Sequence, residues 1–206
     1  MSETPLIHVV DDDESLRTSL LRLLGAAGFE ARGYGSTGDF LLQPPPDRPG
    51  CVLLDLRMPG PSGLELQAAL KRQGVALPVI FLTGHGNVAS SVRAMQAGAV
   101  DFLTKPVKRE TLFEALRRAL ERDAQERTRR EEADQLRARF ASLTAREREV
   151  VDSVACGKLN KQIAHELGIA ERTVKLHRAS AMAKLAVGSS AELGRLAERL
   201  RALTAE

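Results

Sequence analysis

The first half of the chain contains four short, mostly apolar runs that each lead into a polar residue. LIHVV leads into the acids at 11–13, CVLL into Asp55, PVIFL into Thr83, and DFLT into Lys105. Continuous apolar runs of this length are typical of parallel strands covered on both faces. Because ligands of an open parallel sheet bind outside the carboxyl ends of its strands, we expect these polar side chains to meet at one edge.

The segments between the runs carry apolar residues at helical spacing, as in Leu16, Leu20 and Leu24. FEARGY reads as a further, more exposed strand. Strands that alternate with helices indicate βα units and a parallel sheet. We therefore predict a five-stranded, doubly wound, flavodoxin-like α/β domain, with helices at about 16–27, 36–42, 62–73, 87–97 and 109–123.

A charged segment separates this domain from the rest of the chain. Residues 122–140 are mostly charged and contain no Gly or Pro, which predicts an exposed linker helix. A charged, disordered linker is the alternative, because helix propensity alone holds a helix poorly in water. The predicted parts are thus a first domain at 1–121, a helical linker at 122–140 and a second domain at 141–206.

The last part of the chain shows helical patterns only. Thr144 and Glu147 form a capping box, a short helix capped by Asn160 ends at Gly168, and a longer basic helix begins at Glu171. A short helix, a turn containing Gly and a longer helix predict a small all-α helix-turn-helix domain. Serines at 189 and 190 begin a fourth helix. It carries a stripe of leucines that either packs on its own domain or forms a dimer contact on DNA: Leu193, Leu196, Leu200 and Leu203.

Composition narrows the class of protein. No run of 18 apolar residues exists, the N-terminus lacks the pattern of a secretory signal, and the two cysteines fall in different segments. We therefore expect a cytoplasmic protein with no membrane span, disulfide framework or zinc site. Residues 1–106 carry 9 Lys and Arg against 11 Asp and Glu, whereas residues 141–206 carry 11 against 8. This asymmetry permits nucleic-acid binding by the last part.

The polar residues at the strand ends suit a hard cation and a phosphoryl group. Asp11, Asp12 and Asp55 repel one another, so bringing them together is costly without a cation. Mg²⁺ prefers oxygen ligands and uses one or two carboxylates together with phosphate oxygens. Asp55 can then take a phosphoryl group as a carboxylate nucleophile, with Thr83 and Lys105 on the phosphate. The alternative for the acids at 11–13 is a helix N-terminus, where carboxylates favour the dipole and cap N–H groups.

These motifs resemble two known families. VVDDDES, CVLLDLRMPGPSG, VIFLTGHG and AMQAGAVDFLTKP resemble a response-regulator receiver domain over about residues 4–121. SLTAREREVV and GKLNKQIAHELGIAERTVKLHRASAMAKL resemble the LuxR-type helix-turn-helix over about residues 140–203. The combination is similar to the FixJ-type transcriptional activators.

The receiver resemblance implies a role for each acid. Asp55 is the expected phosphoacceptor, Asp12 a direct Mg²⁺ ligand, and Asp11 a residue that acts on the metal mainly through water. The backbone carbonyl of Arg57 is implied as a further ligand. Asp13 is expected at the start of the helix that follows.

The resemblance also implies which residues respond to phosphorylation of the site. Thr83 is the hydroxyl that moves toward the phosphoryl group, and Phe102 occupies the aromatic switch position three residues before Lys105. Phe102 has no hydroxyl to expose, as is usual in FixJ-type receivers, and it also serves the core. The Lys105–Pro106 peptide bond is expected to be cis.

The helix from Glu171 is the predicted recognition helix, whose N-terminal residues meet base edges in the major groove. Val174, His177 and Ala181 are expected to face the domain core, and the opposite stripe to face DNA: Arg172, Lys175, Leu176 and Ala179. Lys175 can donate to guanine acceptors and Leu176 can touch a thymine methyl. Ala179 departs from the basic residue that other LuxR-type domains often carry. Phosphate contacts, which position without specifying sequence, are assigned to Lys161, Thr173 and Arg178.

Together these features predict a phosphorylation-activated DNA-binding transcriptional regulator and not an enzyme. A cognate sensor histidine kinase supplies the phosphoryl group, Asp55 accepts it with Mg²⁺, and the chain forms a homodimer that binds double-stranded promoter DNA. The dimer surface is expected within residues 87–103, with Val88 and Val92 as contacts unless they serve the core.

Two other functions compete with this prediction. The acid cluster also suits a phosphatase of the aspartyl-phosphate type, but such an enzyme needs no helix-turn-helix. A constitutive DNA-binding regulator whose receiver serves only dimerisation is the second alternative. The complete set of acids, threonine and lysine argues against a decayed site.

Overall fold

The chain divides into two compact units, residues 1–127 and 128–206. The computed structural model describes residues 4–43, 45–84 and 88–204, with side chains as far as residue 201. The helix predicted at 36–42 is followed in the sequence by three prolines that are expected to end it, and the helix predicted at 87–97 begins at Asn87. The first of these prolines, Pro44, and Asn87 lie outside the described residues. Among the described residues, no helix combines the length and the apolar character that crossing a membrane requires.

The first unit is built on a parallel five-stranded sheet with the strand order β2-β1-β3-β4-β5. The central strands β1, β3 and β4 are buried along their whole length, as their continuous apolar runs predict, and the edge strand β2 is partly exposed. The strands are β1 (Leu6–Val10), β2 (Glu30–Tyr34), β3 (Gly50–Leu54), β4 (Val79–Thr83) and β5 (Asp101–Thr104).

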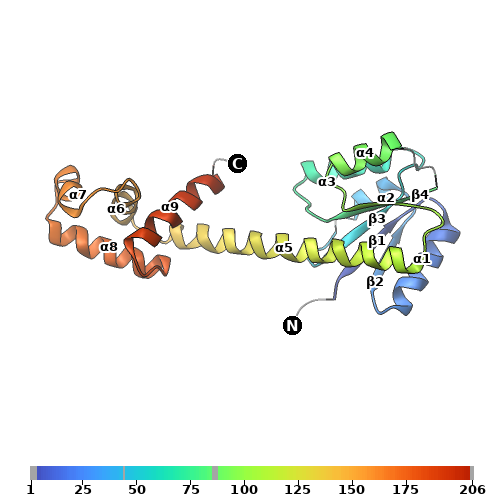
Figure 1. Cartoon of the computed structure of the whole chain (residues 1–206), viewed down its shortest axis with the longest axis horizontal. Coiled ribbons are helices and arrows are strands. Elements are labelled where there is room, and N and C mark those ends of the chain that lie inside the picture. The colour runs from blue at the N-terminus through green and yellow to red at the C-terminus, as the bar shows by residue number, and fades with distance from the viewer. Residues whose placement is uncertain (1–3, 44, 85–87, 205–206) are drawn as a thin grey trace. The chain divides into compact units, whose positions relative to one another are not determined.

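Helices cover both faces of this sheet. They are α1 (Glu14–Ala26), α2 (Thr37–Leu42), α3 (Gly63–Arg72), α4 (Val88–Gln96) and α5 (Arg109–Ala141). Ile7 and Cys51 point into the core under α1 and α5, while Val52 and Phe81 point into the core under α2, α3 and α4. Figure 1 shows α3 and α4 on one side of the sheet and α1 and α5 on the other. The predicted doubly wound α/β fold is confirmed.

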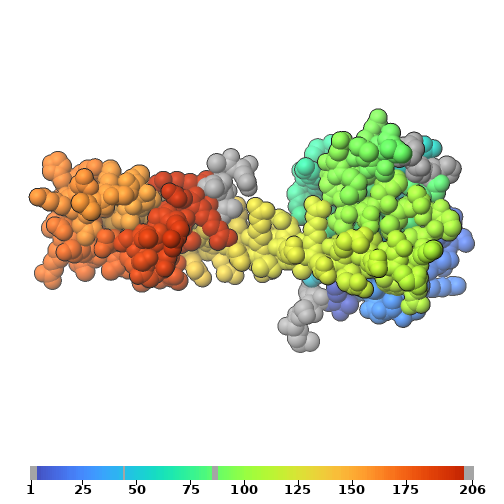
Figure 2. All heavy atoms as spheres, viewed as in Figure 1, coloured from blue at the N-terminus to red at the C-terminus, as the bar shows by residue number. Residues whose placement is uncertain are grey.

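Helix α4 carries its apolar stripe on the outside. Val88 is 80% exposed, Val92 46% and Met95 47%, whereas Ala94 is buried against the sheet. The atoms of α4, green in Figure 2, form part of the outer surface of the first unit. Val88 and Val92, for which the sequence leaves both positions open, therefore do not belong to the core.

The predicted linker helix is present, and it is a continuation of α5, which runs from Arg109 to Ala141 without a break. The helix is not exposed throughout, contrary to the expectation from its charge. Asp123, Ala133 and Leu136 are buried, and Phe140 packs against the core of the second unit.

The second unit consists of the end of α5 and four further helices among the described residues: α6 (Ala145–Ala155), α7 (Asn160–Leu167), α8 (Glu171–Leu185) and α9 (Ser190–Thr204). In the leucine stripe of α9, Leu193 is fully buried in the core of its own domain, and Leu196 packs on that core. The side chain of Leu203 lies outside the described residues. Packing on its own domain therefore accounts for the described start of this stripe.

The start of α7 differs from the sequence-based expectation. Asn160 does not cap the helix: Leu159 occupies the N-cap position, and its N–H donates to the Gln162 side chain at 2.8 Å. The Asn160 side chain instead accepts from Arg178, at 3.0 Å. A tertiary partner on α8 thus competes for the oxygen that a local cap uses.

Glu147 forms the predicted capping box with Thr144, but it also ties α6 to α8. Its buried carboxylate accepts from Lys184 and Ser180, each at 2.7 Å, and from the Thr144 N–H at 2.8 Å. These bonds, led by that of Lys184, lower the pKa of Glu147 from 4.5 to about 2.

We expect Glu147→Gln to destabilise the second unit by about 2 kcal/mol at neutral pH, because hydrogen bonds to a charged acceptor are lost. Since the folded pKa lies below the unfolded one, this stabilisation is complete above pH 4.5 and disappears as pH falls toward about 2. Urea unfolding, monitored by hydrogen exchange of the α6 and α8 amides, measures the difference in unfolding free energy between wild type and variant. Glu149→Gln, at an exposed position, is the control. If the difference in unfolding free energy between wild type and Glu147→Gln is the same at pH 7 and near pH 2, the role assigned to the Glu147 carboxylate is wrong.

Candidate functional site

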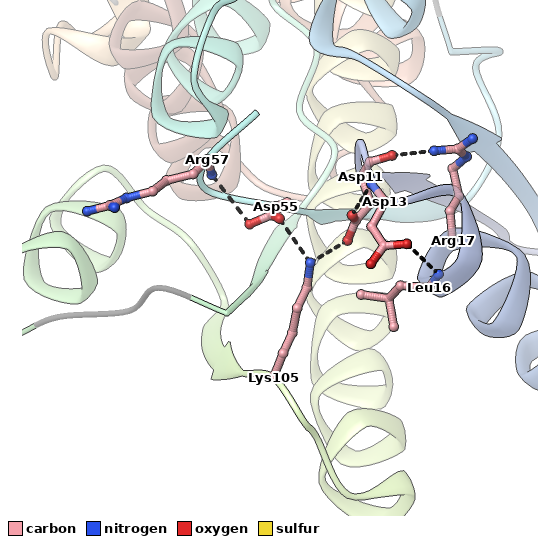
Figure 3. Close-up of polar contacts among 7 residues, drawn as sticks. All are labelled: Asp11, Asp13, Leu16, Arg17, Asp55, Arg57 and Lys105. Carbon is pink, nitrogen blue, oxygen red and sulfur yellow. Dashed lines mark hydrogen bonds and ion pairs between the residues drawn. The ribbon is translucent and has the colours of Figure 1, made fainter. Parts of the chain in front are cut away.

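The carboxyl ends of β1, β3 and β5 meet around one ammonium group. Asp11 follows β1, Asp55 follows β3, and Lys105 follows β5. Figure 3 shows Lys105 reaching between the two acids; its Nζ lies 2.6 Å from Asp11 Oδ2 and 2.9 Å from Asp55 Oδ2. Asp11 and Asp55 are buried. The polar residues that follow separate strands thus form one pocket, as the strand-end rule predicts.

Burial and charge oppose each other in this pocket. Burial raises the pKa of Asp11, although the bonds from Lys105 and the Asp13 N–H act in the opposite direction. Burial also disfavours the charged form of Lys105, but the two carboxylates outweigh it and raise its pKa. Lys105 therefore stays an ammonium group and holds Asp11 and Asp55 together.

A third carboxylate completes the acidic group. One oxygen from each of Asp11, Asp12 and Asp55 lies within 4.8 Å of the others, and Asp12 is the exposed member. Asp13 is not part of the group: it is the N-cap of α1 and accepts from the Leu16 N–H at 3.0 Å. The helix-cap interpretation therefore holds for Asp13, whereas Asp11 and Asp12 belong to the acidic group.

Of the remaining expected site residues, Thr83 and Arg57 lie at the same edge, and Phe102 lies further back along β5. Thr83 ends β4 and is buried, and its carbonyl accepts from the Lys105 N–H at 2.9 Å. Phe102 is half-buried on β5, its ring 6.1 Å from that of Phe81. The Arg57 N–H donates to Asp55 Oδ1 at 3.3 Å, and its side chain points away from the pocket (Figure 3). The Lys105–Pro106 peptide bond is cis, as the resemblance implies.

Two residues that the sequence patterns do not single out support the pocket. Arg17 on α1 donates to the backbone carbonyl of Asp11 at 2.6 Å (Figure 3). Its stem crosses β2 at Gly33, where an added Cβ would lie 3.1 Å from the Arg17 Cδ. Gly63 lets the start of α3 approach Asp55, because a Cβ there would lie 2.2 Å from the Asp55 carbonyl oxygen. For Gly63 the sequence does contain a signal, because it is a glycine that begins a helix shortly after a predicted site residue.

Helix α8 presents the expected stripe on the surface. Arg172, Lys175, Leu176 and Ala179 are exposed, Leu176 at 63%. Val174 and Ala181 are fully buried on the opposite side, and His177 is half-buried between them. Both sides of the helix are thus as the spacing predicts.

The basic residues around this stripe differ in how they are held. Lys175 lies 3.7 Å from the Glu171 carboxylate, and Lys161 is exposed on α7. Arg178 and Thr173 are half-buried. Because Arg178 donates to Asn160, its guanidinium is already positioned between α7 and α8.

Both units match protein families. Residues 7–117 match the response regulator receiver domain, and residues 141–197 match the LuxR family of bacterial regulatory proteins. The chain therefore belongs to the response regulators that join a receiver domain to a LuxR-type DNA-binding domain, and it is a two-component transcription regulator.

Several known proteins are similar to nearly the whole chain. Nodulation protein W of Bradyrhizobium diazoefficiens is 43% identical over 97% of this chain and 88% of that protein. The transcriptional regulatory protein FixJ of Rhizobium meliloti is 42% identical over 93% of this chain and 94% of that protein. Among solved structures, response regulator StyR is similar with a TM-score of 0.85 and 46% identity, over 96% of this chain and all of that one.

Proposed function

We propose that Asp55 accepts a phosphoryl group from a partner histidine kinase, with Mg²⁺ in the acidic pocket, and that the phosphorylated chain dimerises and binds promoter DNA. The observation that carries this proposal is the buried Asp55 carboxylate, held by Lys105 beside the acids that follow β1. In the transfer, an Asp55 oxygen bonds to phosphorus while the bond from phosphorus to the histidine nitrogen breaks. The electron pair of the broken bond stays on the histidine nitrogen.

The pocket fits Mg²⁺ by the chemistry of its donors. Three carboxylates supply the oxygen ligands that this ion prefers, and the backbone carbonyl of Arg57 is the proposed further ligand. Asp12, the exposed acid, is the proposed direct ligand, and Asp11 acts mainly through water. The ion supplies positive charge for the phosphoryl oxygens. Lys105 contributes the second positive charge, and the buried Thr83 hydroxyl hydrogen-bonds a phosphoryl oxygen.

The proposed response passes from Thr83 to the surface of α4. Thr83 ends β4, and Phe102 on the neighbouring strand β5 packs against Phe81. A shift of Thr83 toward the phosphoryl group changes the space open to Phe102. The exposed Val88 and Val92 on α4 then supply the apolar contacts of the dimer.

Sedimentation velocity with and without beryllofluoride, a phosphoryl mimic, tests this function. We expect wild type to shift from monomer to dimer on addition of the mimic, and Val88→Asp with Val92→Asp to stay monomeric because charges interrupt the apolar contact. Leu42→Asp is the control, since Leu42 is an exposed apolar residue on a different helix, 82% exposed where Val88 is 80% exposed. One unchanged wild-type species at high concentration contradicts the mechanism.

At the DNA, Lys175→Ala and Lys161→Ala are expected to have different effects. Lys175→Ala should weaken binding to the preferred site by about 1–3 kcal/mol and relax the preference at one base pair. Lys161→Ala should weaken all sequences alike and lower the salt slope by about one unit, because phosphates carry no sequence information. Selection from a random DNA pool with both variants distinguishes these outcomes. If the Lys175 variant keeps every base preference, Lys175 contacts the backbone.

The two alternatives predict different results. A phosphatase turns over small phosphomonoesters, and we expect none. A constitutive regulator binds DNA equally well with and without acetyl phosphate, and we expect tighter binding with it.

A further inference from the structure

A buried carboxylate joins the linker part of α5 to the start of β3. Asp123 is only 3% exposed, and its Oδ2 accepts from the Gly50 N–H at 3.0 Å. Gly50 is the first residue of β3, and a Cβ on it would lie 2.3 Å from the Leu6 carbonyl oxygen on β1. Gly50 precedes the residues of β3 that pair with β4, which begin at Val52, and its N–H has its acceptor outside the sheet, in Asp123.

Arg127, one turn further along α5, donates three hydrogen bonds at the same position, to Asp123 and to the segment before β3. Its Nε donates to Asp123 Oδ2 at 3.1 Å, one terminal nitrogen to Asp47 Oδ1 at 2.9 Å, and the other to the Arg48 carbonyl at 2.5 Å. Arg48 in turn pairs with Glu30 at the start of β2, at 2.7 Å. The segment before β3 is thus bonded to α5 on one side and to the sheet on the other.

This cluster lies at the opposite end of β3 from the phosphoacceptor. Gly50 begins the strand and Asp55 follows its last residue, so one short buried strand separates the two groups. Further along α5, residues 128–132 are exposed; beyond them Ala133 and Leu136 are buried, and Phe140 packs against the core of the second unit. Asp123 and Arg127 therefore bind the receiver at the point where α5 enters that exposed stretch.

We propose that Asp123 and Arg127 form a latch that fixes the linker helix to the receiver, and that control of DNA binding by phosphorylation passes through this latch. The coupling part rests on the proposed function. A helix can carry a change of position only if one end is held against the part that moves. The hydrophobic face of α5 ends near Ala119 and Leu120, so beyond it the latch supplies that hold.

The test uses the full chain with Asp123→Asn, which keeps the side-chain volume, and Arg127→Ala. Arg129→Ala is the matched control, since it makes the same charge change at an exposed position on the same helix. Three quantities are measured: labelling by acetyl phosphate with Mg²⁺, hydrogen exchange of the Gly50 amide and of residues 120–127, and DNA affinity with and without acetyl phosphate. The DNA probe is a fragment selected from a random pool by the wild-type chain.

We expect both latch variants to be labelled as wild type, to exchange faster at Gly50 and residues 120–127, and to lose at least about five-fold of the affinity gain on phosphorylation, the lower range of allosteric couplings. Arg129→Ala should match wild type throughout. A full affinity gain in variants whose amides exchange faster overturns the coupling, and unchanged exchange overturns the latch itself. Loss of labelling would place the role in the phosphoryl pocket instead, which also overturns the coupling. If the wild type itself is not labelled or gains no DNA affinity on phosphorylation, the proposed function is wrong. That outcome is distinguishable from failure of the coupling because it is seen without any variant.

Discussion

Asp55→Asn is expected to reduce phosphoryl labelling of the chain to background. An amide cannot form the acyl phosphate, because its nitrogen replaces one carboxylate oxygen and its remaining oxygen is a weak nucleophile. The fold should survive, since the two side chains have nearly the same shape and Lys105 keeps the Asp11 carboxylate as a partner. Intact mass after incubation with acetyl phosphate and Mg²⁺ measures the labelling.

The control for this variant is Asp47→Asn, which makes the same chemical change at a residue whose side chain is 91% exposed. It should be labelled as wild type. Undiminished, stable labelling of Asp55→Asn would show that another residue is the acceptor.

Asp12→Ala is the second change with a large expected effect: Mg²⁺-dependent labelling should be lost. Loss of a direct carboxylate ligand should exceed the roughly 10- to 100-fold effects seen for groups that only orient ligands. Asp12 is exposed, so its removal leaves the core of the receiver untouched. Titration of the labelling rate with MgCl₂ measures the change.

Asp13→Ala is the matched variant next to it. Asp13 caps α1 through the Leu16 N–H, so its loss should cost about 1 kcal/mol of stability and leave the Mg²⁺ dependence in place. Thermal unfolding and the same titration separate the two effects. Equal loss of labelling in both variants, with normal folding, would mean that the acids have been assigned to the wrong roles.

The convergence of the pocket can be predicted because it follows from two local features. An apolar run defines each strand, and the residue after the run lies at the carboxyl end of that strand. Asp55 and Lys105 are 50 positions apart in the chain, yet Lys105 Nζ lies 2.9 Å from the Asp55 carboxylate. Parallel strands bring such residues to the same edge whatever the length of the connecting helices.

Contacts between the surfaces of two elements could not be predicted in the same way. Arg17 reaches the Asp11 carbonyl only because α1 packs across β2 at Gly33. Asn160 has the sequence context of a cap, but Arg178 on another helix takes its oxygen. The apolar stripe of α4 has the spacing of a core face, and only the packed structure shows that Ala94 is buried while Val88, Val92 and Met95 are exposed.

The sequence by itself determined the alternation of strands and helices, the polar residues at the strand ends, and the helix-turn-helix with its exposed stripe on α8. All of these depend on the spacing of apolar residues within one element, which is readable along the chain. The tertiary structure alone decided which charged residues are buried and what they contact, as for Asp123 at Gly50 and Glu147 at Lys184. The physical reason is that a buried charge needs a partner in space, and the position of that partner depends on how two separate elements pack.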